Sequence, residues 1–324
     1  MATWQRSLAT LSLCHTATMK RFLPFFVLAG GILVASTAAI LIRLAQQEGM
    51  PSLTIATGRM LIASLILTPL AWSRAGADLR QLGRRDLLLG LGAGLFLAIH
   101  FAAWISSLGY TSVASSTALV ATNPLWVAIA SFFLFRERLG RLAWVGIGLT
   151  FVGTILILIS DGWGETAVSA THSAPLLGNG LALLGAVAAS GYFLIGRQVR
   201  ARLSLLAYIW LVYSSAALIL LITTLLVGQS LLGYSLLAYL FVLGLAIGPQ
   251  LLGHTAFNWS LRYLSATFVA VAILGEPVGS AILAFILLQE NVATLQLAGL
   301  IVLLLGIYLA AISERHRKKK VVSG

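Results

Sequence analysis

The strongest constraint on the fold is an internal repeat that stays in register without a gap. The stretch SSLGYTSVASSTALVATNPLW recurs as WSLRYLSATFVAVAILGEPVG, and the residues after each stretch keep the same offset. That offset is 153 residues, both from Pro124 to Pro277 and from Glu137 to Glu290. Chance similarity between apolar segments would not hold prolines, tyrosines and acids in phase. The chain therefore consists of two halves built alike.

Ten apolar segments divide the chain, each about 20 residues long, which is enough to cross a hydrocarbon core of about 30 Å as a helix. With 59% hydrophobic and only 9% charged residues and a mean hydropathy of +0.98, most of the surface must face lipid. We therefore predict an all-α polytopic membrane protein. The predicted transmembrane helices lie near 23–44, 53–72, 87–107, 112–135, 142–159, 176–196, 204–227, 234–258, 264–287 and 293–313.

Five spans fall in each half, and this odd number turns the second half upside down relative to the first. We expect two inverted five-helix repeats, at 23–160 and 176–313, around a central cavity. An outer linker at 161–175 joins them, and 1–22 and 314–324 form cytoplasmic tails. Inverted repeats are typical of secondary transporters, whose substrate site lies near the midplane between the repeats.

The positive charge of the chain, +12 in all, is distributed by loop. With ten helices and both termini in the cytoplasm, 19 of the 21 Lys and Arg residues fall on the inner side, as the positive-inside rule requires. A nucleic-acid partner is not expected, since the charges lie in short clusters between apolar segments. The inner residues are Arg6, Lys20, Arg21, Arg74, Arg80, Arg84, Arg85, Arg136, Arg138, Arg141, Arg197, Arg200, Arg202, Arg262, Arg315, Arg317, Lys318, Lys319 and Lys320. The outer side holds Glu48, Asp161, Glu165 and Glu290.

The repeated pattern resembles a known family. ATNPLWVAIASFFLFRERL and its counterpart ILGEPVGSAILAFILLQENV are similar to the two EamA-type repeats of the drug/metabolite transporter superfamily. The resemblance implies a bundle of two inverted five-helix halves around a cavity, and transport of small metabolites, often as export. Known members handle amino acids, drugs, nucleotide sugars and other solutes. LQENV departs from the family pattern by lacking a basic residue, so we expect Glu290 only to end a helix.

A carboxylate stands near the middle of the predicted ninth span, in ILGEPVGSAILAF. A charged side chain at the bilayer centre costs roughly 2.5 kcal/mol or more, so such residues usually face a cavity or a partner. We expect Glu276 to line the central cavity, where it exchanges a proton or binds a cationic group of the substrate. The alternative is a structural acid that is hydrogen-bonded to Ser and Thr hydroxyls.

Two prolines occupy equivalent positions in the halves, Pro124 in the fourth span and Pro277 in the ninth. Each removes a backbone N–H and displaces the carbonyl four residues earlier. Such a helix break is tolerated in a membrane where it lines a cavity, and a simple packing kink is the other interpretation. Asn123 precedes Pro124 as Glu276 precedes Pro277, so a neutral amide is the counterpart of the acid.

Polar side chains also form stripes on the third and eighth spans. Gln250, His254 and Asn258 recur every fourth residue, which places them on one face of a helix. His100 and Trp104 form a similar stripe, and His100 lies within one residue of the position equivalent to His254. These residues are expected to line the cavity, whereas a lone buried histidine is more often only hydrogen-bonded.

Arg59 lies two turns into the second span, inside TIATGRMLIAS. It could extend to the outer surface, pair with Glu48 or Glu276, or hold an anionic group. The first two interpretations are favoured slightly. Arg43 lies near the membrane edge and needs no special role.

Other classes of protein fit the sequence less well. An integral membrane enzyme with a polar site at mid-depth is the main alternative, but no H-E-x-x-H or G-x-S-x-G motif occurs. A channel would need a continuous polar lining. Two histidines lack a third metal ligand, and the single cysteine, Cys14, forms no internal disulfide. We expect no catalytic residue, cofactor or metal.

The function that these features favour is secondary transport of small metabolites, such as amino acids or drug-like solutes, across the plasma (inner) membrane. Alternating access is the expected mechanism, with export the favoured direction and proton coupling an option. The expected partners are a small-molecule substrate and the lipid bilayer, and a homodimer is left open.

Overall fold

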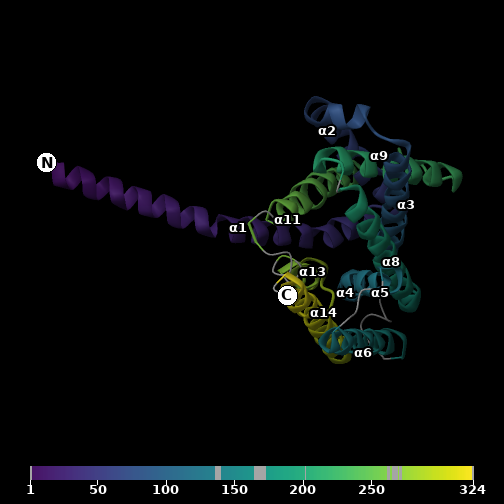
Figure 1. Cartoon of the computed structure of the whole chain (residues 1–324). Helices are drawn as coiled ribbons and strands as arrows, with labels where there is room; N and C mark the ends of the chain where they lie inside the picture. The colour runs from purple at the N-terminus through teal and green to yellow at the C-terminus, as the bar shows by residue number, and fades with distance from the viewer. Residues whose placement is uncertain are drawn as a thin grey trace.

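The computed structural model describes residues 2–135, 140–163, 173–200, 202–260, 263–264, 269 and 272–322, and these residues form helices and the turns between them (Figure 1). The elements are α1 (Ala2–Gln47), α2 (Ser52–Arg80), α3 (Arg84–Ser107), α4 (Val113–Val120), α5 (Asn123–Phe135), α6 (Arg141–Trp163), α8 (Pro175–Val199), α9 (Leu205–Leu226), α10 (Leu236–Leu245), η1 (Ala246–Gly253), α11 (His254–Ser260), α13 (Gly275–Leu288) and α14 (Thr294–Val322). Predictions that involve Arg136, Glu137, Arg138, Glu165 and Arg262 fall outside the described residues. Those on the side chains of Asn258, Arg6, Lys20, Arg21 and 315–320 do so too.

Within the described ranges, nine segments are long and apolar enough to cross a membrane. They confirm nine of the ten predicted spans, from Phe22–Gln47 to Thr294–Ile312. The remaining prediction, 264–287, corresponds to α13, an apolar but shorter helix of 14 residues. The chain is thus an all-helical polytopic membrane protein with ten membrane helices.

The first helix is longer than the sequence analysis suggested. It begins at Ala2, within the segment expected to be a cytoplasmic tail, and continues to Gln47. No glycine or proline occurs before Pro24, so no residue with a poor helix propensity interrupts the helix at its start.

The two halves are inverted relative to each other, as the packing of α6 against α14 shows. These are the fifth helices of the two halves, and they lie side by side (Figure 1). Gly146 lies against Ala310, whereas Gly153, two turns later in α6, lies against Leu303, which comes earlier in α14. Equivalent helices therefore run antiparallel. An axis along the membrane normal would make them parallel, so the pseudo-symmetry axis lies in the membrane plane.

The second helices of the two halves, α2 and α9, confirm this relation. The hydroxyl groups of Ser64 and Ser214 are 2.7 Å apart. One turn further along α2, Thr68 accepts a hydrogen bond at 2.9 Å from Trp210, which lies one turn earlier in α9. This pair of equivalent helices is antiparallel too.

A matched pair of hydrogen bonds links each half to the other. The hydroxyl of Ser36 in α1 is shared between the carbonyl oxygens of Ile32 at 2.8 Å and Glu276 at 3.2 Å. The hydroxyl of Ser190 in α8, 154 residues after Ser36, is likewise shared between those of Ala186 at 2.8 Å and Asn123 at 2.9 Å. The first helix of each half thus holds the residue before the proline in the fourth helix of the other half.

The prolines lie where helices begin. The fourth span is divided into α4, which ends at Val120, and α5, which begins at Asn123. Pro124 therefore lies in the first turn of α5, and Pro277 lies in the first turn of α13. The first turn tolerates proline because its N–H groups have no partner within the helix. The break places Asn123 and Glu276 at helix starts.

Candidate functional site

A cavity of about 680 Å³ with several polar side chains in its wall lies between the two halves. Its size falls within the range of about 300–1,000 Å³ that is usual for small-molecule sites. Both halves contribute to its wall, through α1, α2, α3, α4, α5, α8, α9, η1, α11 and α13. The polar and aromatic lining residues are Arg59, His100, Phe101, Trp104, Asn123, Tyr192, Phe193, Arg197, Arg200, Tyr208, Tyr213, Gln250, His254 and Glu276.

The structure brings together seven of the eight residues that the sequence analysis selected for this site. Arg59, His100, Trp104, Asn123, Gln250, His254 and Glu276 all line the cavity. The eighth residue, Asn258, has a side chain outside the described residues. Pro124 and Pro277 are not lining residues, but the residues before them are.

The sequence analysis missed seven polar or aromatic residues that line the cavity, two of which are Phe101 and Phe193. Arg197 and Arg200 were assigned only to an inner loop, although their spacing of three residues places them on one face of a helix. The cavity-lining tyrosines Tyr192, Tyr208 and Tyr213 could not be recognised from the sequence. Tyrosine is also common where membrane helices meet the membrane–water interface, so its presence does not indicate a cavity.

Arg59 lies inside the bundle, so the prediction that it extends to the outer surface is wrong. The residue is 1% exposed, and its Nε donates to Oε1 of Gln250 at 2.9 Å. The guanidinium carbon lies 4.3 Å from the ring centre of Phe101 and 5.8 Å from that of Trp104. Its position on α2 points it inward, where the two rings stabilise the cation through their π electrons.

Pairing of Arg59 with an acid is not observed either. Glu48 instead accepts a hydrogen bond from Ser235 at 2.6 Å. Between Arg59 and Glu276, both of which the structure describes, no nitrogen–oxygen pair lies within 4.0 Å. The two opposite charges therefore line one cavity without a direct ion pair.

His100 is held in a defined orientation on α3. Its Nδ1 lies 2.9 Å from the carbonyl oxygen of Gly185 in α8, and its ring stacks on Trp104 with 5.9 Å between ring centres and 16° between planes. A carbonyl only accepts, so Nδ1 carries the proton, and Nε2 of the neutral ring is an acceptor.

The eighth span differs from the predicted continuous α-helix. Residues Ala246–Gly253 form a π-helix that contains Pro249 and is followed by α11. Proline lacks the N–H that an α-helix needs at this position, and π-helical turns are often found at functional sites. Gln250 and His254 still line the cavity, on either side of the change from π- to α-helix.

An ion pair closes the bundle at one end. Arg43 in α1 contacts Glu290 at 2.8 Å and donates to the carbonyl oxygen of Leu108 at 2.6 Å. The second carboxylate oxygen of Glu290 accepts from the backbone N–H of Val113 at 2.8 Å. The expectations that Glu290 only ends a helix and that Arg43 needs no special role are therefore wrong. Gln289, with φ of 55°, turns the chain at the end of α13 and directs Glu290 toward α4.

Asp161 is also buried, whereas the sequence analysis assigned it to an outer loop. It lies in α6, is 1% exposed, and accepts a hydrogen bond from Asn179 in α8 at 2.7 Å. Gln296 in α14 lies 3.4 Å from the same carboxylate. This cluster joins three helices outside the cavity and has a structural role.

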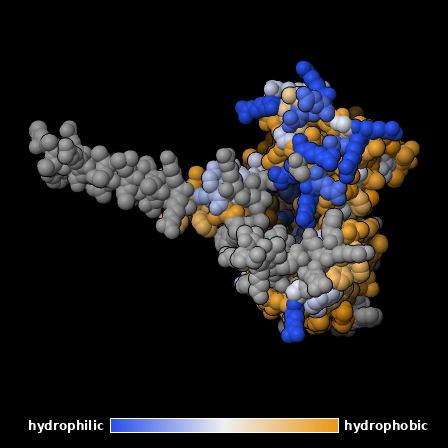
Figure 2. Space-filling view, viewed as in Figure 1, coloured by the Kyte–Doolittle hydropathy of each residue, from blue (hydrophilic) through white to orange (hydrophobic). Residues whose placement is uncertain are grey.

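The cavity extends toward the opposite end of the bundle. Its lining on α8 continues to Arg200, just past the last turn, whereas on α3 it stops at Trp104, before the Arg43–Glu290 pair. The turns at this opposite end are joined by the pair of Asp86 and Arg202 at 3.3 Å. Hydrophilic side chains gather there, over α2 and α9 at the top of the view (Figure 2).

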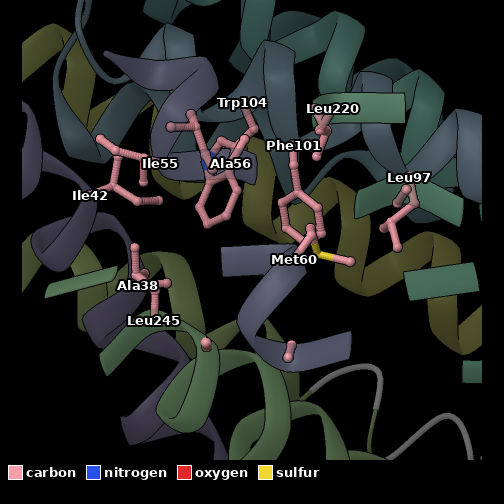
Figure 3. Packing of buried hydrophobic residues seen from close by; sticks show 14 of the residues in the cluster. Ala38, Ile42, Ile55, Ala56, Met60, Leu97, Phe101, Trp104, Leu220 and Leu245 are labelled. Atoms are coloured by element: carbon pink, nitrogen blue, oxygen red, sulfur yellow. The ribbon is translucent and has the colours of Figure 1, made fainter. Parts of the chain in front are cut away.

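The wall beside Arg59 is part of the largest buried cluster of the protein. Phe101 and Trp104 belong to this cluster, together with Met60 of α2 and Leu97 of α3 (Figure 3). The aromatic surface is therefore backed by packed side chains, which hold its orientation.

Comparison with known proteins identifies the family. Residues 22–159 and 176–312 each match the EamA-like transporter family. The chain belongs to the EamA-like transporter family. The match confirms the family that the repeated motifs suggested. The protein is therefore a membrane transporter and not an enzyme.

Several known proteins align with most of the chain. The uncharacterized transporter YetK of Bacillus subtilis is 25% identical over 323 residues, which cover 92% of this chain and 94% of YetK. A probable amino-acid metabolite efflux pump of Salmonella typhimurium is 30% identical over 255 residues, which cover 74% and 80%. The crystal structure of another protein superimposes with a TM-score of 0.62 over 90% of this chain and 98% of that protein. Their sequences are 19% identical, so this similarity supports the fold alone.

Proposed function

We propose that this EamA-like protein is a secondary transporter that moves small metabolites, such as amino acids or drug-like solutes, by alternating access. The observation that carries the proposal is the cavity between two inverted halves, which reaches one end of the bundle and stops short of the Arg43–Glu290 pair at the other. A site between inverted repeats can open to either side by a rocking movement of one half against the other.

The lining suggests the roles of individual residues. Glu276 is the proposed proton carrier, because its carboxylate has no hydrogen-bond partner in the part of the chain that the structure describes and lies free in the cavity. His100, Trp104, Gln250 and His254 would contact the substrate, with Asn123 and Asn258 beside them. The breaks at Pro124 and Pro277 would let the half-helices α5 and α13 change their angle.

The orientation follows from charge. Arg80, Arg84, Arg85, Arg200 and Arg202 lie at the end to which the cavity extends. The positive-inside rule places that end in the cytoplasm. In this orientation the cavity faces inward in the plasma (inner) membrane, with both termini cytoplasmic. Loading from the cytoplasm suits export, the function named for the Salmonella typhimurium relative.

Counterflow in proteoliposomes tests the proposal. Purified protein is reconstituted with a high internal concentration of one unlabelled solute, and entry of the labelled solute is followed for amino acids, organic acids and cationic drugs. A transporter gives saturable entry of an unchanged solute. Failure of every solute to exchange above protein-free liposomes would reject the proposal.

The ion pair at the closed end gives a separate prediction. Glu290→Gln should weaken the contact with Arg43 and raise the population of the state open at that end about fivefold, which corresponds to about 1 kcal/mol. The measurement is labelling of an Ala38→Cys cavity reporter by a membrane-impermeant maleimide added from outside, in a Cys14→Ser background. Asp86→Asn, which changes an acid that pairs with Arg202 at the opposite end of the bundle, is the matched control. Equal labelling of both variants would contradict the prediction.

A further inference from the structure

The charges that line the cavity are unbalanced. Among the residues that the structure describes, Arg59 and Arg200 line it with a single acid, Glu276. Arg200 lies toward the end to which the cavity extends, and Arg59 is fully buried at its inner wall. A cavity with a surplus of cationic groups concentrates anions and repels cations.

Two buried donors in this wall lack acceptors within the described part of the chain. Nη1 of Arg59 has no hydrogen-bond partner, although Nε of the same group is bonded to Gln250. Nε1 of Trp104 also has none. Leaving a buried donor unsatisfied costs about 1–3 kcal/mol and more for a charged group, so native structures rarely keep one without a reason.

The two donors are close to each other and next to aromatic faces. The guanidinium carbon of Arg59 lies 5.8 Å from the ring centre of Trp104 and 4.3 Å from that of Phe101. Both groups donate and neither accepts. The missing ligand atoms must therefore be acceptors, and an anionic oxygen satisfies a guanidinium best.

We propose that the substrate is a small organic acid whose carboxylate binds the guanidinium group of Arg59 and whose planar or apolar body lies against Phe101 and Trp104. Gln250 positions Arg59 through the bond at 2.9 Å to its Nε. The lone acid Glu276 on the same cavity disfavours a second anionic group and leaves room for a neutral or cationic one. This inference rests on the proposed transport function, because it names the substrate class of the same cavity.

Binding to purified protein in detergent tests the inference without requiring transport. The probes are benzoate, phenylacetate and phenylalanine, each compared with its neutral or cationic amide, and the readout is the shift in melting temperature with ligand concentration. We expect the acids to bind and the amides to bind about 10- to 100-fold more weakly, as expected for loss of a hydrogen bond to a charged group. Arg59→Gln should reduce the affinity for acids by the same factor, and Arg59→Lys should restore part of it.

A matched control separates the cavity from general surface charge. Arg202 lies near Arg200 but pairs with Asp86 outside the cavity, so Arg202→Gln should leave the affinity for acids unchanged. Equal binding of acids and amides by the unmodified chain would overturn the inference, and so would an Arg59→Gln variant with full affinity. If Arg59→Gln does not fold, the comparison of acids with amides on the unmodified chain decides the matter alone.

Counterflow with the same solutes distinguishes the two proposals. Exchange of neutral or cationic solutes without exchange of acids would leave the transport function standing and reject the organic-acid inference. Binding of acids that depends on Arg59, without exchange of any solute, would support the site and reject transport.

Discussion

Glu276→Gln is expected to abolish accumulation of substrate driven by a proton gradient. Glu276 lines the cavity at the start of α13, and its carboxylate has no hydrogen-bond partner among the described residues. This geometry disfavours the alternative of a structural acid bonded to Ser and Thr, since Ser36 bonds the backbone carbonyl and not the carboxylate. Glutamine keeps the size and shape of the side chain but cannot release or bind a proton at neutral pH.

The measurement is uptake into proteoliposomes with an imposed pH difference, compared with counterflow at equal pH. We expect gradient-driven accumulation to fall at least about tenfold, the equivalent of about 1.4 kcal/mol, while counterflow persists and loses its dependence on pH. Glu48→Gln serves as the control because Glu48 is an acid outside the cavity. Full accumulation by the Glu276 variant would exclude its role as proton carrier.

Gly146→Val should disrupt the pairing of α6 with α14. A Cβ added at Gly146 would lie 2.6 Å from the backbone nitrogen of Ala310 and 2.6 Å from the carbonyl oxygen of Gly306. These are backbone atoms of a helix and cannot move aside as a side chain can. Small residues are what allow close approach of membrane helices, so we expect destabilisation of about 3 kcal/mol, the upper part of the range for overpacking.

Gly148→Val, two residues along the same helix, provides the comparison. No heavy atom lies within 4 Å of a Cβ built there. Both variants replace glycine by valine in the same helix, so they change helix propensity by the same amount. The difference in stability between them therefore measures the packing of α6 against α14. We expect Gly146→Val to lower the melting temperature in detergent and the yield of monodisperse protein, and Gly148→Val to change neither. A similar loss of melting temperature and yield in both variants would contradict the prediction that Gly146 is needed for the close packing of α6 against α14.

The fold could be predicted from the sequence because lipid imposes one rule on every helix. A span needs length and apolar residues, and these are local properties that can be counted. The inversion could be predicted as well, because the repeat divides the spans into two sets of five. The short α13 and the π-helix were not predicted, since Pro249 marks a disturbed helix without saying which geometry replaces it.

The cavity could be predicted only in part. Residues such as Gln250 and His254 were identified because a polar side chain is conspicuous in an apolar helix. The inward direction of the Arg59 side chain could not be predicted. The position of Arg59 in the second span indicates its depth in the membrane but not which face of the helix points into the bundle. The contact of Arg43 with Glu290 depends on the left-handed backbone conformation of Gln289. This conformation could not be predicted, because it is usually adopted by glycine or asparagine and position 289 is a glutamine.

The crossed serine bonds have a consequence for movement. Ser36 is hydrogen-bonded to the start of α13, and Ser190 is hydrogen-bonded to the start of α5. The first helix of each half is therefore bonded to the proline-containing half-helix of the other half. Under the proposed alternating access, we expect a tilt of one half-helix to displace the serine-bearing helix of the opposite half. Opening at one end of the bundle would then be coupled to closure at the other end, which would prevent a leak through both ends at once.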